Sequence, residues 1–273
     1  MSRSIIFNAD DLGMSEEIDR GILRAVRAGL VKEVSVCVTA APQRAVIAEL
    51  AELGAGIGLH FCVTEGRALF GAQPGLTNAA GDFLGLPRVL LATVRSRLSP
   101  RCIERELMAQ LDALQDFGVT PTHINGHHHA HAFPVIRDVI LREAVRRACP
   151  HVRVPLERAP PWRGGPRGVL LRSLGKGLAS AARKAGVPVR PVVGLELTGS
   201  AHFRREALEL AARLRDDVVE WVVHPREGDT PHSLATVGAR HAGPQELAAL
   251  EDPELSAILK QRGYQAVGYL EIL

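Results

Sequence analysis

Ile5-Ile6-Phe7-Asn8-Ala9-Asp10-Asp11 is an apolar run that ends in two adjacent carboxylates. Three other short strand-like runs also end in polar residues that could carry chemistry. They are Ile57-Gly58-Leu59-His60, Thr122-His123-Ile124-Asn125 and Trp221-Val222-Val223-His224. Short apolar runs of this kind are typical of buried strands. The repeated pattern predicts that distant parts of the chain meet at one end of a sheet and form one active site.

Helical segments separate the apolar runs, which predicts an α/β fold with a parallel sheet. The expected strands are 5–8, 34–39, 57–60, 122–125, 151–154, 192–196, 218–224 and 266–270. The expected helices are 16–28, 43–53, 101–117, 134–148, 170–185, 204–214 and 253–262. The polar residues follow the first, third, fourth and seventh strands, and a barrel gathers those strand ends on one face. We therefore expect a single TIM-like (β/α) barrel domain over residues 1–273.

Local signals fix some of the expected boundaries. Ser15 is the expected N-cap of the first helix and Gly29 its C-terminal stop, while Asp252 is the expected N-cap of the last helix. No G-x-G-x-x-G follows the first strand, so a dinucleotide site is not supported.

Two segments differ from this pattern. Residues 65–100 are rich in Gly and Pro, and a long loop in a compact domain is usually functional, as a lid or a substrate wall. Residues 155–191 resemble an insertion, with eight basic residues against Glu157 as the one acid. This basic segment is interpreted either as a solvated helix or oligomer contact, or as a weak contact with an anionic membrane surface or lipid-linked substrate.

Composition narrows the function classes. The net charge of +3 is small for 273 residues and argues against nucleic acid as a partner. The chain has no apolar run long enough to span a membrane and no signal-peptide pattern, so we expect a cytoplasmic protein. The four cysteines, Cys37, Cys62, Cys102 and Cys149, form no C-x-x-C pair, which indicates reduced thiols and gives no indication of a thiolate zinc site.

Histidine is concentrated in one short stretch of the chain. Five of the eleven histidines lie between 123 and 131, in Thr122-His123-Ile124-Asn125-Gly126-His127-His128-His129-Ala130-His131. Imidazole is the commonest protein ligand for metals and the commonest acid–base group near neutral pH. Five histidines cannot all bind one ion, but two histidines, one aspartate and water suit Zn²⁺.

Each of the other candidate residues also has a structural interpretation that involves no chemistry. Asp10 and Asp11 could divide metal binding and proton transfer between them, or could be an N-cap pair after a strand. His60 alone could be a satisfied core histidine, and His224 could lie in a surface turn or act as a general acid. The remaining histidines, His151, His202, His232 and His241, are expected to be structural.

Four segments together resemble the YdjC-like (ChbG/HpnK) family of carbohydrate deacetylases. Asn8-Ala9-Asp10-Asp11-Leu12-Gly13-Met14-Ser15 is similar to its N-A-D-D-F-G-[LM]-S signature, and Gly58-Leu59-His60-Phe61 to its G-[LM]-H-hydrophobic motif. The histidine-rich segment resembles T-H-x-D-x-H-H-x-x-H, and His224-Pro225 a late H-P element. The motifs occur in order, and the similarity is weakest over residues 65–100 and 155–190.

The resemblance implies a distorted (β/α) barrel that uses one divalent metal ion, Zn²⁺ or Mg²⁺, to remove acetyl groups from N-acetylated sugars. By motif position it implies Asp11, His60 and His127 as metal ligands, Asp10 as general base and His224 as general acid. The expected substrate contacts and supports of the ligands are His123, Asn125, His128, His129 and His131. Asn125 stands where the family usually has Asp, and Leu12 where it has an aromatic residue.

These residues predict a metal-dependent hydrolase that gives acetate and an amino sugar from an N-acetylated saccharide or glycolipid. Two alternatives stay open at this point: another metal-dependent hydrolase of the phosphoesterase type, and a metal-binding protein without catalysis. A phosphoesterase usually needs two metals or several basic clamps. A homo-oligomer is compatible with the sequence but is not indicated by any motif.

Overall fold

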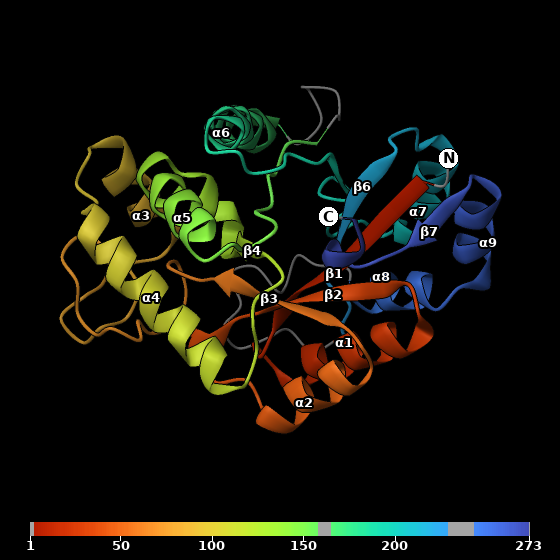
Figure 1. Cartoon of the computed structure of the whole chain (residues 1–273), viewed down its shortest axis with the longest axis horizontal. Helices are drawn as coiled ribbons and strands as arrows, with labels where there is room; N and C mark the ends of the chain where they lie inside the picture. Colours follow the sequence, from red (N-terminus) through yellow and green to blue (C-terminus); the bar gives the residue numbers. More distant parts are fainter. Residues whose placement is uncertain (1–2, 158–164, 229–242, 273) are drawn as a thin grey trace.

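A curled parallel sheet forms the centre of the computed structural model, which describes residues 3–157, 165–228 and 243–272 (Figure 1). The strands are β1 (Arg3–Leu12), β2 (Val31–Val36), β3 (Gly56–Phe61), β4 (Ile124–Gly126), β5 (Val192–Val193), β6 (Val218–Val223) and β7 (Tyr264–Ala266). Their order is β4-β3-β2-β1-β6-β5, and β7 pairs with the first residues of β1. All pairs are parallel, so the carboxyl ends of the strands share one edge.

The sheet is a half-barrel flanked by helices, which confirms the predicted TIM-like α/β fold. One segment spans the gap between its end strands β4 and β5. Val152 forms an isolated parallel bridge with Ile124, and Glu157 forms another with Val192. The predicted strand 151–154 was wrong in extent, because within it only Val152 pairs with a neighbouring strand, as an isolated bridge.

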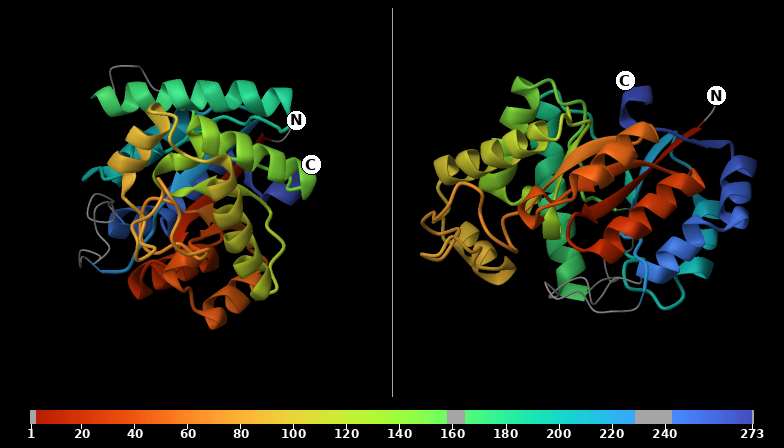
Figure 2. Two further views of the ribbon diagram at one scale, coloured as in Figure 1. Left: turned by 90° about the vertical axis from the view of Figure 1, so that its left-hand side faces the viewer. Right: turned by 90° about the horizontal axis from the view of Figure 1, so that it is seen from below.

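Helices cover the outside of the sheet (Figure 1). They are α1 (Glu16–Ala28), α2 (Arg44–Glu52), α3 (Leu86–Val94), α4 (Pro100–Asp116), α5 (Pro134–Arg146), α6 (Gly165–Lys184), α7 (Phe203–Arg213), α8 (Gly243–Leu250) and α9 (Pro253–Gln261). The short 3₁₀ helices are η1 (Val38–Ala40), η2 (His127–Ala132) and η4 (Tyr269–Ile272). The long helix α6 packs on α5 and η2 (Figure 2). None of the described helices is long and apolar enough to cross a membrane.

The predicted caps of two helices are confirmed. The side chain of Ser15 accepts a hydrogen bond from the N–H of Ile18, and Gly29 ends α1 with a left-handed φ of 98°. The side chain of Asp252 accepts from the N–H of Glu254 at the start of α9. These caps satisfy N–H and C=O groups that a helix end leaves without an internal partner.

Two helices were missed by the sequence analysis. Residues 65–100 are not irregular throughout, because α3 begins at Leu86-Pro87, directly after Gly85. Gly85 and Pro87 had indicated a loop, yet proline in the first turn of a helix lacks only an N–H that would be unpaired anyway. The same reasoning applies to α8, which begins at Gly243-Pro244.

The predicted last strand, 266–270, was also wrong. β7 ends at Ala266, and the chain then turns into η4, where the N–H of Tyr269 donates to Glu33 Oε1 at 2.6 Å. The fully buried ring of Tyr269 stacks on His151 with 4.2 Å between ring centroids and lies 4.8 Å from the ring of His123. The end of the chain therefore fills the interior near the amino ends of the strands and leaves their carboxyl ends for the site.

Candidate active site

The predicted site residues meet at the carboxyl edge of the sheet. Asp10 and Asp11 lie in the last residues of β1, and His60 in the last residues of β3. His127 is the first residue after β4, and His224 the first after β6. The structure thus brings together residues up to 214 positions apart, as the pattern of strand ends predicted.

The end of β1 explains how two neighbouring carboxylates reach one site. The strand was expected to end before Asp10, but it continues to Leu12. Its pairing with β2 has an irregular register after Ala9. Asp11 has a left-handed φ of 73°, which interrupts the alternation of side chains along a strand. As a result Asp10 Oδ1 lies 4.0 Å from His60 Nδ1, while Asp11 Oδ1 lies 3.2 Å from His60 Nε2.

Asp11 connects the two histidines implied as metal ligands. Its Oδ1 lies 3.0 Å from His127 Nδ1 and 3.2 Å from His60 Nε2. Burial alone would raise the pKa of the Asp11 carboxyl, but the charges and hydrogen bonds of His127 and His60 hold it well below its usual range. The carboxylate is therefore ionised and available to a cation.

The outer nitrogens of both histidines are held by acceptors. His60 Nδ1 donates to Asn125 Oδ1 at 2.7 Å, and His127 Nε2 donates to Glu65 Oε2 at 3.1 Å. Metal-binding histidines usually donate their second N–H to such an acceptor, which fixes the ring and directs the other nitrogen to the metal. Two oriented imidazoles and an ionised carboxylate are a donor set that suits a divalent ion. Asn125 therefore supplies through its amide oxygen the acceptor that an Asp would supply.

Cys37 joins this group, although its sequence context gave no sign of a metal site. Its sulfur and single donor atoms of Asp11, His60 and His127 all lie within 4.8 Å of one another. A second group of donors consists of Glu65, His127 and His128 and shares His127 with the first. We interpret this second group as the support of His127, because Glu65 accepts from the nitrogen that points away from Asp11.

Asp10 is held by a buried arginine that the sequence analysis missed. Arg153 is fully buried, and its guanidinium group contacts both oxygens of Asp10, with Nη2 2.9 Å from Oδ1. Its Nε donates to the buried carboxylate of Glu220, which also accepts from His151. Burial alone would raise the pKa of Asp10, but Arg153 together with His60 and His224 holds it well below its usual range.

His224 lies between two carboxylates. Its Nε2 is 3.9 Å from Asp10 Oδ2, and its Nδ1 is 3.9 Å from Glu246 Oε2. Glu246 is buried in α8 and accepts the backbone N–H of His224 at 2.6 Å. Burial raises the pKa of the Glu246 carboxyl. The imidazole is thus placed to contact Asp10 on one side and Glu246 on the other.

The other histidines of the cluster take different positions. His128 and His129 have left-handed φ values of 55°, and His128 Nδ1 lies 2.8 Å from Thr64 Oγ1. His129 Nδ1 is buried and has no hydrogen-bond partner among the described residues, and burial lowers the pKa of this imidazole well below its usual range. His131 Nε2 donates to the carbonyl oxygen of Arg153 at 2.9 Å, and burial lowers the pKa of His131 to about 4.

His123 lies deeper than the rest of the cluster. It is fully buried, and its Nε2 accepts from Asn8 Nδ2 at 3.0 Å and lies 2.8 Å from Ser35 Oγ. Ser35 in turn accepts from Asn125 Nδ2, which also donates to Asp10 Oδ1 at 3.0 Å. His123 therefore supports the site from below through this network and is not positioned to face a substrate.

The remaining histidines fit their structural interpretation where the structure describes them. His151 is buried and lies 3.2 Å from Glu220 Oε2, while His202 is exposed before α7. His232 and His241 lie outside the described residues, as do residues 158–164 of the basic segment.

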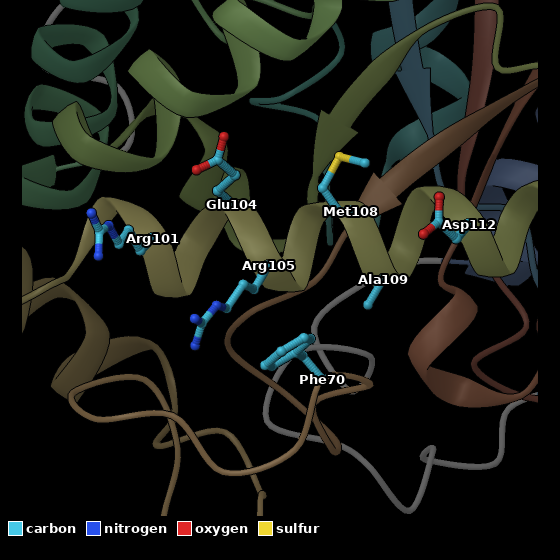
Figure 3. A pocket seen from close by; sticks show the side chains of 7 residues that line it. All are labelled: Phe70, Arg101, Glu104, Arg105, Met108, Ala109 and Asp112. Atoms are coloured by element: carbon cyan, nitrogen blue, oxygen red, sulfur yellow. The ribbon is translucent and has the colours of Figure 1, made fainter.

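The surface pocket shown in Figure 3 contains none of these residues. It has a volume of about 450 Å³ and lies along α4, with Phe70 from the loop after β3 on one side. The guanidinium group of Arg105 lies over the ring of Phe70 at 5.3 Å, so this ring face is already covered. We therefore place the chemistry at the carboxyl edge of the sheet and not in this pocket.

The sequence and the fold of this chain are similar to those of known proteins. The family model described as YdjC-like protein matches residues 4–261. A carbohydrate deacetylase of Geobacillus stearothermophilus is 34% identical over 275 residues, covering 99% of this chain and 98% of the relative. A carbohydrate deacetylase of Brevibacillus brevis is 36% identical over 152 residues, covering 55% and 59% of the two chains. An Enterococcus faecalis protein named for cellobiose-phosphate cleavage has the same fold, with a TM-score of 0.74, 18% identity and coverage of 100% and 99%.

Proposed function

Because the chain belongs to the YdjC-like family, we propose that it is a metal-dependent carbohydrate deacetylase. It hydrolyses the acetamide of an N-acetylated saccharide, so that water and the amide give acetate and a free amino sugar. The observation that carries this proposal is the convergence of Asp11, His60 and His127 beside a second ionised carboxylate, Asp10. The deacetylases among the relatives support the substrate class.

In this proposal one divalent ion binds to Asp11, His60 and His127. When bound, such an ion supplies Lewis-acid chemistry, lowering the pKa of the attacking water and polarising the acetyl carbonyl. Asn125 and Glu65 orient the two imidazoles through their outer nitrogens. The amide of Asn125 also donates to Asp10, which couples the orientation of the metal ligand His60 to that of the base.

Asp10 acts as the general base of the reaction. Its pairing with Arg153 keeps it ionised at neutral pH, so it is always ready to accept a proton from the attacking water. The same pairing makes it a weaker base than a free carboxylate. A weak base is sufficient here, because a bound ion would also lower the pKa of the attacking water.

His224 acts as the general acid. An amine leaves an acetamide only after its nitrogen is protonated, and His224 lies across Asp10 from the metal ligands. Its Nδ1 lies 3.9 Å from the carboxyl group of Glu246, and its Nε2 lies 3.9 Å from Asp10 on the side of the site. His129, a half-buried imidazole whose pKa is lowered by burial of its ring nitrogen, is proposed to contact the substrate.

The substrate is either a free saccharide or a glycolipid. Most of the described part of the basic segment is α6, which carries Arg172, Lys176, Arg183 and Lys184 and exposes the apolar side chains of Val169 and Leu170. This combination supports a weak contact with an anionic surface, and therefore makes a lipid-linked saccharide worth testing.

Acetate release tests the proposed function. The full chain is offered a panel of N-acetylated saccharides, chito-oligosaccharides and glycolipids, before and after chelation and after reloading with Zn²⁺ or Mg²⁺. We expect release that chelation abolishes and metal restores, with one ion per chain. Phosphate release from phosphoesters with two ions per chain would support the phosphoesterase alternative instead. Metal binding with neither product would indicate a binding protein.

A further inference from the structure

A buried thiol lies against the proposed metal ligands. Cys37 directly follows β2, and the pairing of Leu12 with Val36 brings it beside the end of β1. Its backbone N–H donates to the carbonyl oxygen of Leu12 at 2.9 Å. The position of Cys37 next to Asp11 is therefore fixed by strand pairing and not by a loose loop.

The Cys37 thiol also differs in its contacts from two other cysteines of the chain. Its side chain is fully buried (0% exposed), and it makes no hydrogen bond among the described residues. In contrast, the thiol of Cys62 donates to the carbonyl oxygen of Glu65 at 3.3 Å, and that of Cys149 to the carbonyl oxygen of Pro121 at 3.8 Å. A buried polar atom without a partner, placed among three metal-donor atoms, points to a ligand that all four share.

We propose that Cys37 is a fourth ligand of the metal site and makes it selective for Zn²⁺ over Mg²⁺. This inference rests on the proposed function, because it needs the ion held by Asp11, His60 and His127. Thiolate and imidazole suit Zn²⁺, whereas Mg²⁺ prefers oxygen ligands in octahedral geometry. On binding, the thiol releases its proton to solvent and the sulfur coordinates as thiolate. Zinc also accepts a fifth ligand, so four protein donors still leave a place for water.

Cobalt substitution tests the sulfur ligand without an activity assay. The full chain is stripped of metal, loaded with Co²⁺ and followed by absorption spectroscopy. We expect visible d–d bands together with a near-ultraviolet thiolate-to-cobalt charge-transfer band. Visible bands without the charge-transfer band in the wild-type protein would overturn the proposal while leaving the metal site intact. The absence of every cobalt band would instead count against the proposed function itself.

Two variants locate the sulfur. Cys37→Ser is expected to keep the visible bands at saturating Co²⁺ but to lose the charge-transfer band. The matched control is Cys62→Ser, which removes a buried thiol from the end of β3 and is expected to keep both bands. The opposite result, with the band lost in Cys62→Ser alone, contradicts the assignment to Cys37. The wild-type spectrum decides whether a sulfur binds even if a variant fails to fold.

Metal selectivity gives a second, independent measurement. Zn²⁺ and Mg²⁺ affinities are measured by competition with a chromophoric chelator for the wild-type protein, Cys37→Ser and Cys62→Ser. Removing the sulfur is expected to weaken Zn²⁺ binding on the order of 100-fold, at the upper end of what is lost with a supporting residue. Mg²⁺ binding should change little, because Mg²⁺ does not use the sulfur. Unchanged Zn²⁺ affinity, or an equal loss for both ions, would reject Cys37 as a selectivity-determining ligand.

Discussion

The guanidinium group of Arg153 binds both carboxylate oxygens of Asp10, and both side chains are buried. Through its Nε the same group also holds Glu220. A planar guanidinium can bind two carboxylates at once in fixed directions, whereas an ammonium is a single point charge. The position and the charge of Asp10 therefore depend largely on Arg153, which lies on the segment between β4 and β5.

Replacing Arg153 should change both the acidity of Asp10 and the stability of the protein. In Arg153→Lys the pKa of Asp10 should rise, so that the acid limb of the kcat/KM profile moves to higher pH. In Arg153→Met two buried carboxylates lose their counter-ion, which should lower the free energy of unfolding by about 3–5 kcal/mol. Rate profiles and urea unfolding measure the two effects. An unmoved acid limb in a destabilised Arg153→Lys protein would limit Arg153 to a structural role.

Acid should destabilise the metal-free protein through the same cluster. The pKa values of Asp10 and Glu220 are lower in the folded chain than in the unfolded chain, despite burial, because of Arg153. Their contribution is therefore complete above the unfolded carboxyl pKa of about 4 and is lost as the pH falls below it. Urea unfolding across this range should show the loss, and Glu220→Gln should show a shallower one. Stability that increased on acidification would contradict the assigned sign.

Asp10→Asn and His127→Ala should separate catalysis from metal binding. Asp10 lies outside the ligand group, so Asp10→Asn should retain metal and lose activity by about 10²–10⁴-fold, the usual contribution of a general base. His127→Ala removes a proposed ligand and should lose the metal itself. Metal analysis and acetate release measure both. An active Asp10→Asn enzyme, or a fully loaded His127→Ala protein, would refute the corresponding assignment.

Glu65 should affect metal affinity although it is not a proposed ligand. Its carboxylate accepts from His127 Nε2, so Glu65→Ala removes the group that orients this imidazole and should weaken Zn²⁺ binding about 10–100-fold. Glu65→Gln keeps an acceptor oxygen and should recover part of the loss. The control is Glu104→Gln, which alters an exposed ion pair between Glu104 on α4 and Arg142 on α5. Equal affinities for Glu65→Ala and this control would show that the contact has no orienting role.

Gly58→Ala should destabilise the interior of the half-barrel. A Cβ at Gly58 would lie 2.4 Å from the ring of His123, which is buried and held at both nitrogens. The ring has little room to move, so the added methyl group should cost about 1–3 kcal/mol of unfolding free energy. Gly177→Ala is the control, because there the nearest atom is the flexible end of Arg137. Thermal unfolding measures the stability of both variants. Equal stability of Gly58→Ala and Gly177→Ala would contradict the close packing of His123 on β3.

Local signals predicted the parts of the structure that local interactions determine. The caps of α1 and the strand-end positions of Asp11, His60 and His127 follow from residue type and spacing, and the structure agrees with them. Gly85-Leu86-Pro87 could not be interpreted uniquely, because the same residues begin helices and break them. The resemblance to a family supplied the roles of the residues but not their partners.

The missed residues depend on contacts between distant segments. Arg153 was hidden in an apolar run, and only the approach of β1, β6 and the segment 152–157 shows that it faces two carboxylates. Cys37 became part of the site through the register between β1 and β2, and Glu246 through the packing of α8. The left-handed conformation of Asp11 has no signal in the sequence either.

The segment that carries Arg153 is also the part of the half-barrel that is least paired with the neighbouring strands. Its residues 152–157 have one isolated bridge to β4 and one to β5. Stretches with few backbone hydrogen bonds open locally at a lower free energy than core strands. Each local opening would move the Arg153 guanidinium group away from Asp10, and the Asp10 carboxylate would then be a stronger base. The amide hydrogen exchange rate along residues 152–157 and the basicity of Asp10 would then change together, because both depend on how often this segment opens.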